Sequence, residues 1–111
     1  MNLEHVILPN LLQKLPLNRT EISQGVLNIE NKERSNLFPW NGQFSPQFVE
    51  VLLKSYSNTD TCVFDPFMGS GTVLVEAATL GLEAAGTEIN PAAYHFASVY
   101  ELSNLSLYRR E

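Results

Sequence analysis

The chain has 111 residues, 44% of them hydrophobic, which is enough for one small domain. Its formal net charge of −5, with lysines and arginines scattered along the chain, argues against a surface that grips nucleic acid by itself, because phosphate contacts need clustered cations. One cysteine excludes an internal disulfide framework. The lack of a secretory leader and of an apolar run long enough to span a bilayer predicts a soluble, cytoplasmic protein with no membrane partner.

The sequence divides into an N-terminal segment, residues 1–36, and a domain, residues 37–111. The segment is poorly defined because prolines interrupt its apolar runs, and within it residues 25–29 predict either a short strand or a docking segment. The first element predicted in the domain is a helix with Ser45 as its N-cap and Pro46 at its first position. Apolar residues at helical spacing give this helix one buried face: Phe48, Val49, Leu52, Leu53 and Tyr56.

A strand, a glycine loop, a helix, a second strand and a third helix are predicted next. Residues 61–64 indicate a strand covered on both faces, with Cys62 as a buried, inert thiol. A helix follows Gly71, residues 84–88 form the second strand, and the third helix begins at Pro91. Because a strand–helix–strand unit crosses over right-handed, the two strands are expected to lie parallel in an α/β fold.

The loop between the first strand and its helix has the sequence Asp-Pro-Phe-Met-Gly-Ser-Gly-Thr, residues 65–72. Its glycines let the backbone pass close under a ligand, and the helix N-terminus behind them offers free N–H groups. The third glycine of a dinucleotide fingerprint and the lysine of a phosphate-cradling loop are both missing. Asp65 would repel a pyrophosphate, so a cofactor with a ribose and an ammonium group but no phosphate suits the loop better. S-adenosylmethionine has that character.

This loop resembles the cofactor motif of the DNA amino-methyltransferases, which methylate adenine N6 or cytosine N4. Glu88, at the end of the second predicted strand, stands where that family has its ribose-binding acid. Upstream, residues 38–50 resemble the family's other cofactor motif, an aromatic and Ser-Pro opening of a helix. The resemblance covers residues 38–96 and implies a partial Rossmann-like methyltransferase fold with an incomplete parallel sheet.

The resemblance also implies individual roles. Asp65 would lie near the ammonium group of the cofactor, Glu88 would bind its ribose, and Ile89 or Asn90 would lie beside its adenine. Ser45 is a candidate for the methionine carboxylate, or a plain helix cap. The predicted cofactor-binding residues are Phe44, Ser45, Pro46, Asp65, Pro66, Phe67, Gly69, Ser70, Gly71, Thr72, Glu88, Ile89 and Asn90.

The catalytic motif of the family is absent from the sequence. That motif is Asp/Asn/Ser-Pro-Pro-aromatic, which orients the target amine and stacks on a flipped base. The chain has no Pro-Pro pair, and residues 90–94 depart from the motif because the aromatic comes one residue late. No catalytic residue is predicted. The chain is expected to be a subunit of a split enzyme whose complementary chain carries the catalytic and target-recognition parts, a truncated gene product, or a fragment of a longer protein, with DNA as a partner through the complete enzyme.

Two other functions stay open. Enzymes that methylate guanine N2 in transfer or ribosomal RNA carry a similar loop, although the opening at residues 43–46 favours DNA. A non-enzymatic remnant would also keep these motifs. His5 and His95 lack the spacing of metal ligands, so no metal site is predicted. The target base, the recognised DNA sequence and the presence of a companion restriction enzyme cannot be predicted from these residues.

Overall fold

The computed structural model describes residues 17–30, 37, 41–106 and 109. Its elements in chain order are the helices α2 (Gln24–Leu27) and α3 (Pro46–Tyr56), strand β1 (Cys62–Asp65), helix α4 (Thr72–Thr79), strand β2 (Glu83–Gly86), helix α5 (Pro91–Ser98) and the 3₁₀-helix η1 (Val99–Asn104). From α3 onward this is the predicted order, which confirms the predicted α/β fold class. The parts of the predicted N-terminal segment and of the motif at residues 38–50 that fall on residues 1–16, 31–36 and 38–40 lie outside the described residues.

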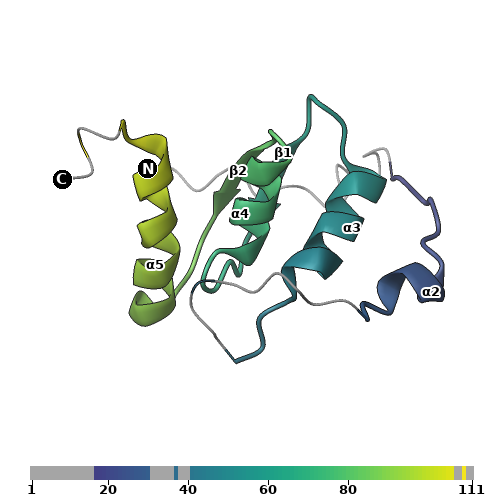
Figure 1. Ribbon diagram of the computed structural model, residues 1–111, viewed down its shortest axis with the longest axis horizontal. Helices are drawn as coiled ribbons and strands as arrows, with labels where there is room; N and C mark the ends of the chain where they lie inside the picture. Colours follow the sequence, from purple (N-terminus) through teal and green to yellow (C-terminus); the bar gives the residue numbers. More distant parts are fainter. Residues whose placement is uncertain (1–16, 31–36, 38–40, 107–108, 110–111) are drawn as a thin grey trace, which may run out of the picture.

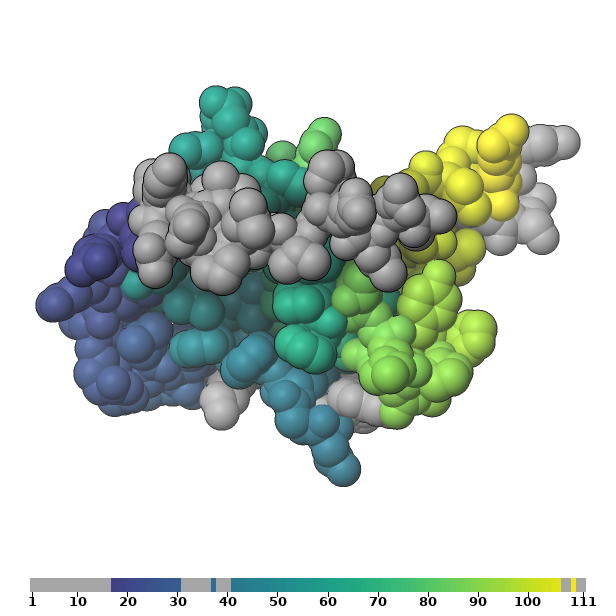
Figure 2. Space-filling view, turned by 180° about the vertical axis from the view of Figure 1, so that it is seen from behind, coloured from purple at the N-terminus to yellow at the C-terminus, as the bar shows by residue number. Residues whose placement is uncertain are grey.

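The two strands form a parallel pair in which residues 62–65 align with residues 83–86. Helix α4 connects them and packs against both strands and against α3, so the helices α3 and α4 lie side by side (Figure 1). Figures 1 and 2 place α2 and α5 at opposite ends of the molecule. Because β1 and β2 are parallel, their carboxyl ends meet at one edge of the sheet. This edge is where α/β folds place their ligands.

The prediction that the first strand is covered on both faces is wrong. Side chains alternate along a strand, and here Val63 is half-buried while Phe64 remains 62% exposed. Cys62 is also exposed, so its thiol is not buried. The apolar run is typical of a strand inside a sheet with two helical layers, whereas in this structure α4 covers one face. Phe64 pairs with the exposed Ala85, which gives the other face of the sheet an apolar pair beside Cys62 and Glu83.

The core is built mostly from small side chains. Val49 of α3 and Ala77 of α4 are buried, and Ala93 and Ala97 are the buried positions of α5. The predicted start of α3 is confirmed, because the Ser45 side chain accepts the N–H of Phe48 at 3.4 Å and proline follows it. The small buried side chains allow the helices to pack closely, and this packing holds in place the elements that carry the site.

Residues 25–29 do not form a strand. Instead Gln24–Leu27 form α2, closed by hydrogen bonds from the N–H groups of Val26 and Leu27 to the Ser23 carbonyl at 3.0 and 3.2 Å. A strand needs a neighbour for its backbone groups, and the two described strands pair with each other. Helix α2 packs against α3, where the Tyr56 hydroxyl donates to the Thr20 carbonyl at 2.8 Å.

Candidate cofactor site

The site begins where β1 ends. The Asp65 carboxylate accepts the N–H of Phe67 at 3.0 Å, which turns the chain out of the strand. Two backbone hydrogen bonds then fasten the loop to the end of β2: the Thr87 N–H donates to the Asp65 carbonyl at 3.0 Å, and the Met68 N–H donates to the Thr87 carbonyl at 3.1 Å. This half of the loop is therefore held by backbone contacts.

The two glycines of the loop have different surroundings. Gly69 and Gly71 have φ angles of 53° and 90°, which favour glycine because other residues are strained there. A Cβ added at Gly69 would meet nothing within 4 Å, so the loop is open at this point. A Cβ added at Gly71 would lie 3.1 Å from the Cβ of Ala97, so Gly71 lets α5 pack directly on the loop.

Gly86, at the end of β2, is a structural requirement that the sequence reasoning missed. A Cβ at this position would lie 2.9 Å from both the Cβ and the Sδ of Met68 and 3.1 Å from the Asp65 carbonyl oxygen. Helix α4 packs against this strand as well. In the structure, Gly86 admits the glycine loop, which lies directly against β2.

Glu88 connects the loop to the start of α5. Its carboxylate accepts the N–H of Gly69 at 2.9 Å and the N–H of Asn90 at 2.7 Å. The Asn90 N–H lowers the pKa of Glu88 most, the N–H groups of Gly69 and Ile89 add to this, and desolvation opposes them, so the net shift is downward. The carboxylate is therefore ionised at neutral pH. Because a carboxylate has about four lone-pair sites, it can accept further hydroxyls while holding both N–H groups.

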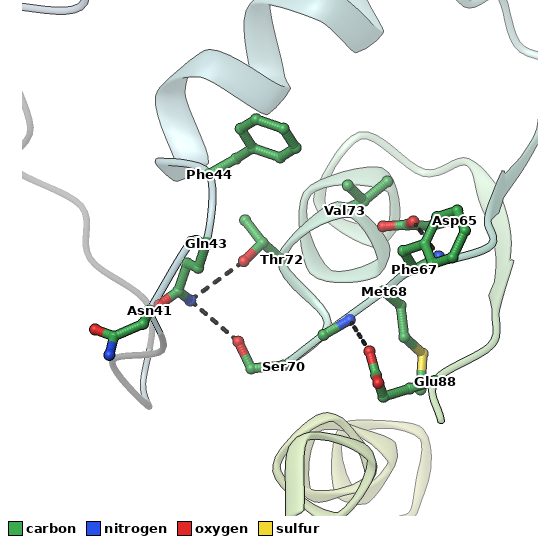
Figure 3. Close-up of a pocket in the computed structure, with 12 residues that line it drawn as sticks. Asn41, Gln43, Phe44, Asp65, Phe67, Met68, Ser70, Thr72, Val73 and Glu88 are labelled. Atoms are coloured by element: carbon green, nitrogen blue, oxygen red, sulfur yellow. Dashed lines mark hydrogen bonds between the residues drawn. The ribbon is translucent and has the colours of Figure 1, made fainter. Parts of the chain in front are cut away.

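Gln43, just before α3, reaches across to the loop from the opposite side. Its Nε2 donates to the hydroxyls of Ser70 and Thr72 at 3.1 and 3.3 Å (Figure 3). The next residue, Phe44, is 60% exposed, and its ring centroid lies 5.5 Å from that of Phe48. The two hydrogen bonds of Gln43 join the segment before α3 to the glycine loop and to the start of α4.

The segment and the loop enclose a pocket with a volume of about 350 Å³. In Figure 3, Asn41, Gln43 and Phe44 stand on one side of it, and Asp65, Phe67 and Glu88 on the other. The lining residues are Asn41, Gly42, Gln43, Phe44, Asp65, Phe67, Met68, Gly69, Ser70, Thr72, Val73 and Glu88. A pocket of this size suits a nucleoside-sized molecule.

Seven of the predicted site residues line this pocket: Phe44, Asp65, Phe67, Gly69, Ser70, Thr72 and Glu88. The others have structural roles around it. Ser45 caps α3, with Pro46 buried at the first helical position, and Asn90 caps α5 by accepting the Ala92 N–H at 3.0 Å. The Pro66 carbonyl accepts the Thr87 hydroxyl at 2.8 Å.

Gly71 lets α5 pack on the loop. Ile89, which follows Glu88 in the chain, is 96% exposed. The prediction did not include five of the lining residues, which are Asn41, Gly42, Gln43, Met68 and Val73. Four of them stand inside the two motifs at residues 38–50 and 65–72, and Val73 directly follows the second, so proximity to a motif was the available signal. Cofactor binding by each residue that the sequence predicts for the site stays a prediction.

The comparison with known proteins agrees with this geometry. A family model described as DNA methylase matches residues 18–99. The chain belongs to this family. The match begins within the N-terminal segment, and the domain boundary predicted at residue 37 stays a prediction.

Two type II methyltransferases are similar to this DNA methylase chain. It is 40% identical to M.MjaII of Methanocaldococcus jannaschii over 67 residues, which is 57% of this chain and 13% of that protein. It is 38% identical to M.MvaI of Kocuria varians over 89 residues, which is 74% of this chain and 19% of that protein. The chain thus spans less than a fifth of the length of these relatives, and the predicted family is confirmed.

A solved structure shares the fold. The crystal structure of an M1.HpyAVI–SAM complex superposes with a TM-score of 0.58 at 25% identity, over 76% of this chain and 40% of that one. The prediction of a partial Rossmann-like methyltransferase fold is therefore confirmed. S-adenosylmethionine, the cofactor predicted from the sequence, is the ligand named for that structure.

Neither a metal centre nor a membrane span is found in the part of the chain that the structure describes. Within it, His, Cys, Asp and Glu side chains form no group of three or more that could hold a metal ion. None of its helices is both long enough and apolar enough to cross a bilayer.

Proposed function

We propose that this chain is the S-adenosylmethionine-binding part of a DNA methyltransferase that methylates adenine N6 or cytosine N4, with residues 37–111 as its domain. The observation that carries the proposal is the pocket at the carboxyl end of β1, where two carboxylates, of Asp65 and Glu88, line an opening over Gly69. The family membership and the S-adenosylmethionine complex of a similar structure support it.

The residues present fit this cofactor by charge and by space. Its ammonium and sulfonium groups are cations, and the pocket offers the carboxylates of Asp65 and Glu88, of which Glu88 has a lowered pKa. Gly69 leaves open space where a ligand would pass close to the backbone. Asp65 would then hold the ammonium group and Glu88 the ribose hydroxyls, with Phe67 in apolar contact. Bound there, the cofactor supplies a methyl group on a sulfonium for in-line displacement.

The groups that orient the target amine are proposed to lie outside these residues, on a complementary chain or on further polypeptide. Two observations support this. The 111 residues contain no Pro-Pro pair, so the family's catalytic tetrapeptide is absent from them. The chain also matches only 13% and 19% of the two curated relatives. DNA contact and target recognition are proposed for the same additional part.

The first test is a calorimetric titration of the chain with S-adenosylmethionine and S-adenosylhomocysteine, with NADH as a phosphate-bearing comparison. Saturable binding of the first two and none of NADH is expected, since the pocket acids repel phosphate. Glu88→Gln should weaken binding by on the order of tenfold, because a charged acceptor of the ribose hydroxyls is lost. Glu83→Gln is the control, because Glu83 is an exposed acid of β2 outside the pocket. Equal affinity in all three proteins would mean that the site is misassigned.

The second test concerns the substrate. The chain alone should transfer no methyl group to DNA. After the part with the tetrapeptide is added, labelled methyl should appear in DNA, and mass spectrometry of the nucleosides distinguishes N6-methyladenine from N4-methylcytosine. Methylation of transfer RNA alone under the same conditions would contradict a DNA substrate.

A further inference from the structure

Gln43 links the two walls of the pocket. We infer that it is a positioning residue, which holds the segment 41–44 against the glycine loop and thereby slows dissociation of the cofactor. The inference rests on the proposed function, because it concerns S-adenosylmethionine in this pocket. It assigns a role to a residue that the predicted cofactor-binding residues do not include.

The burial of its partners shows why the contact matters. Ser70 and Thr72 are 4% and 7% exposed, and buried hydroxyls need hydrogen-bond partners. One amide group of Gln43 has two N–H donors and donates to both hydroxyls, at 3.1 and 3.3 Å. Removing this amide would leave two buried polar groups without these bonds, so the native position of Gln43 is favoured.

The two walls are held in different ways. The wall with Asp65 is continuous with β1 and is tied to β2 by backbone hydrogen bonds of Thr87. The wall with Phe44 is tied to the loop through the Gln43 side chain, 27 and 29 residues away in sequence from its partners. A side-chain change at Gln43 is therefore expected to loosen the Phe44 wall and to leave the other in place.

A second contact secures the chain upstream of this wall. The N–H of Leu37 donates to the Tyr100 hydroxyl at 3.2 Å. The Tyr100 ring in turn lies beside Gly71, with its Cδ2 atom 3.8 Å from where a Cβ of Gly71 would stand. Ser70 and Thr72 flank this same Gly71, so Leu37 and Gln43 are anchored around one point of the loop.

A loosened wall should change dissociation more than association. Phe44 and Asn41 line the pocket next to Gln43, so their displacement removes contacts with a bound ligand. Entry into a wider pocket is not slowed, and affinity differences among variants of one site lie mostly in the dissociation rate. The expected effect is a rise of about five- to tenfold in the dissociation rate and in Kd, the size of one lost hydrogen-bonded anchor.

The test uses Gln43→Met, which keeps the length of the side chain and removes its donors. Binding and dissociation of S-adenosylmethionine are followed by calorimetry and stopped-flow displacement, together with the thermal midpoint of each ligand-free protein. Gln24→Met is the matched control, because Gln24 lies on α2 outside the pocket and bonds the Asn28 side chain at 2.8 Å. Hydrogen exchange of residues 41–45 without ligand should be faster in Gln43→Met and unchanged in Gln24→Met.

A protein that already carries Ser70→Ala and Thr72→Val shows whether Gln43 acts on cofactor binding through these two hydroxyls. In Ser70→Ala/Thr72→Val, the added change Gln43→Met should cause no further loss of affinity, because the partners of the amide are already gone. A full additional loss in that background would mean that Gln43 acts directly on the ligand, which overturns the positioning role. A lower thermal midpoint with unchanged Kd and dissociation rate would also overturn it. Absence of binding by the unsubstituted chain contradicts the proposed function, whereas equal binding by both proteins contradicts only this inference.

Discussion

The close approach of the glycine loop to β2 predicts that Gly86→Ala is strongly destabilising. The new Cβ would lie 2.9 Å from two atoms of Met68, the Cβ and the Sδ, and 3.1 Å from the Asp65 carbonyl oxygen. Carbon atoms in proteins prefer separations of about 3.5–4.0 Å, so the loop has to move by roughly half an ångström or more. Met68 is only 8% exposed, which leaves its side chain little room to turn away.

The magnitude follows from what overpacking costs. An extra methyl group in a packed site destabilises by about 1–3 kcal/mol. For a chain of this length, about 4 °C of thermal midpoint is lost per kcal/mol, so Gly86→Ala should lower the midpoint by roughly 4–12 °C. Because the displaced Met68 and Gly69 are loop residues that line the pocket, affinity for S-adenosylmethionine should fall as well.

Thermal unfolding followed by circular dichroism, with calorimetric titration, measures both effects. Gly25→Ala is the control: a Cβ there meets nothing within 4 Å, and Gly25 lies inside α2, where alanine is favoured by up to about 1 kcal/mol. Adding Met68→Ala to Gly86→Ala removes the Sδ contact and leaves the Cβ contact, so only partial recovery is expected. A Gly86→Ala protein as stable as the unsubstituted chain, with the same affinity, would refute the reasoning.

Two further predictions concern the loop and its acid. Gly69→Val and Gly81→Val should each lose about 1–2 kcal/mol of stability, because both glycines have positive φ, 53° and 74°, in open surroundings. Only Gly69→Val should also abolish cofactor binding in titrations, since Gly81 lies outside the pocket. The lowered pKa of Glu88 means that its contribution to stability is complete above the pKa of an unfolded glutamate and is lost as the pH falls through the folded value. In urea unfolding at a series of pH values, the advantage over Glu88→Gln should therefore be present at neutral pH and disappear on acidification; an advantage independent of pH contradicts this assignment.

The sequence allowed the order of elements and the glycine loop to be predicted, because both depend on local signals. Ser45 and Pro46 mark a helix start by their own chemistry, and the glycines mark left-handed turns. The exposed Phe64 and Cys62 could not be predicted, since an apolar strand has the same sequence whether one or both faces are covered. Burial depends on elements that are distant in the chain.

Part of the site also depended on long-range contacts. Gln43 meets Ser70 and Thr72 across more than 25 residues of sequence, and no spacing rule indicates that pairing. The sequence predicts Glu88 as the acid at the end of the second strand. In the structure β2 ends at Gly86, and Glu88 reaches the pocket because β2 ends beside β1. Its hydrogen bonds to the N–H groups of Gly69 and Asn90 depend on the loop conformation, which the glycine pattern alone does not define.

Charge explains how cofactor binding and DNA binding are divided in the proposed enzyme. The chain carries 12 acidic and 7 basic residues, and two of the acids, Asp65 and Glu88, line the pocket. In the proposed enzyme, carboxylates there would attract a cationic cofactor and repel phosphate, so the feature proposed to select S-adenosylmethionine would also keep the DNA backbone away from the pocket. In the proposed enzyme, a target base would be brought to the methyl group by another part, which we expect to carry the cationic side chains. The cofactor pocket and the DNA-binding surface are therefore expected to be separate, with opposite charge.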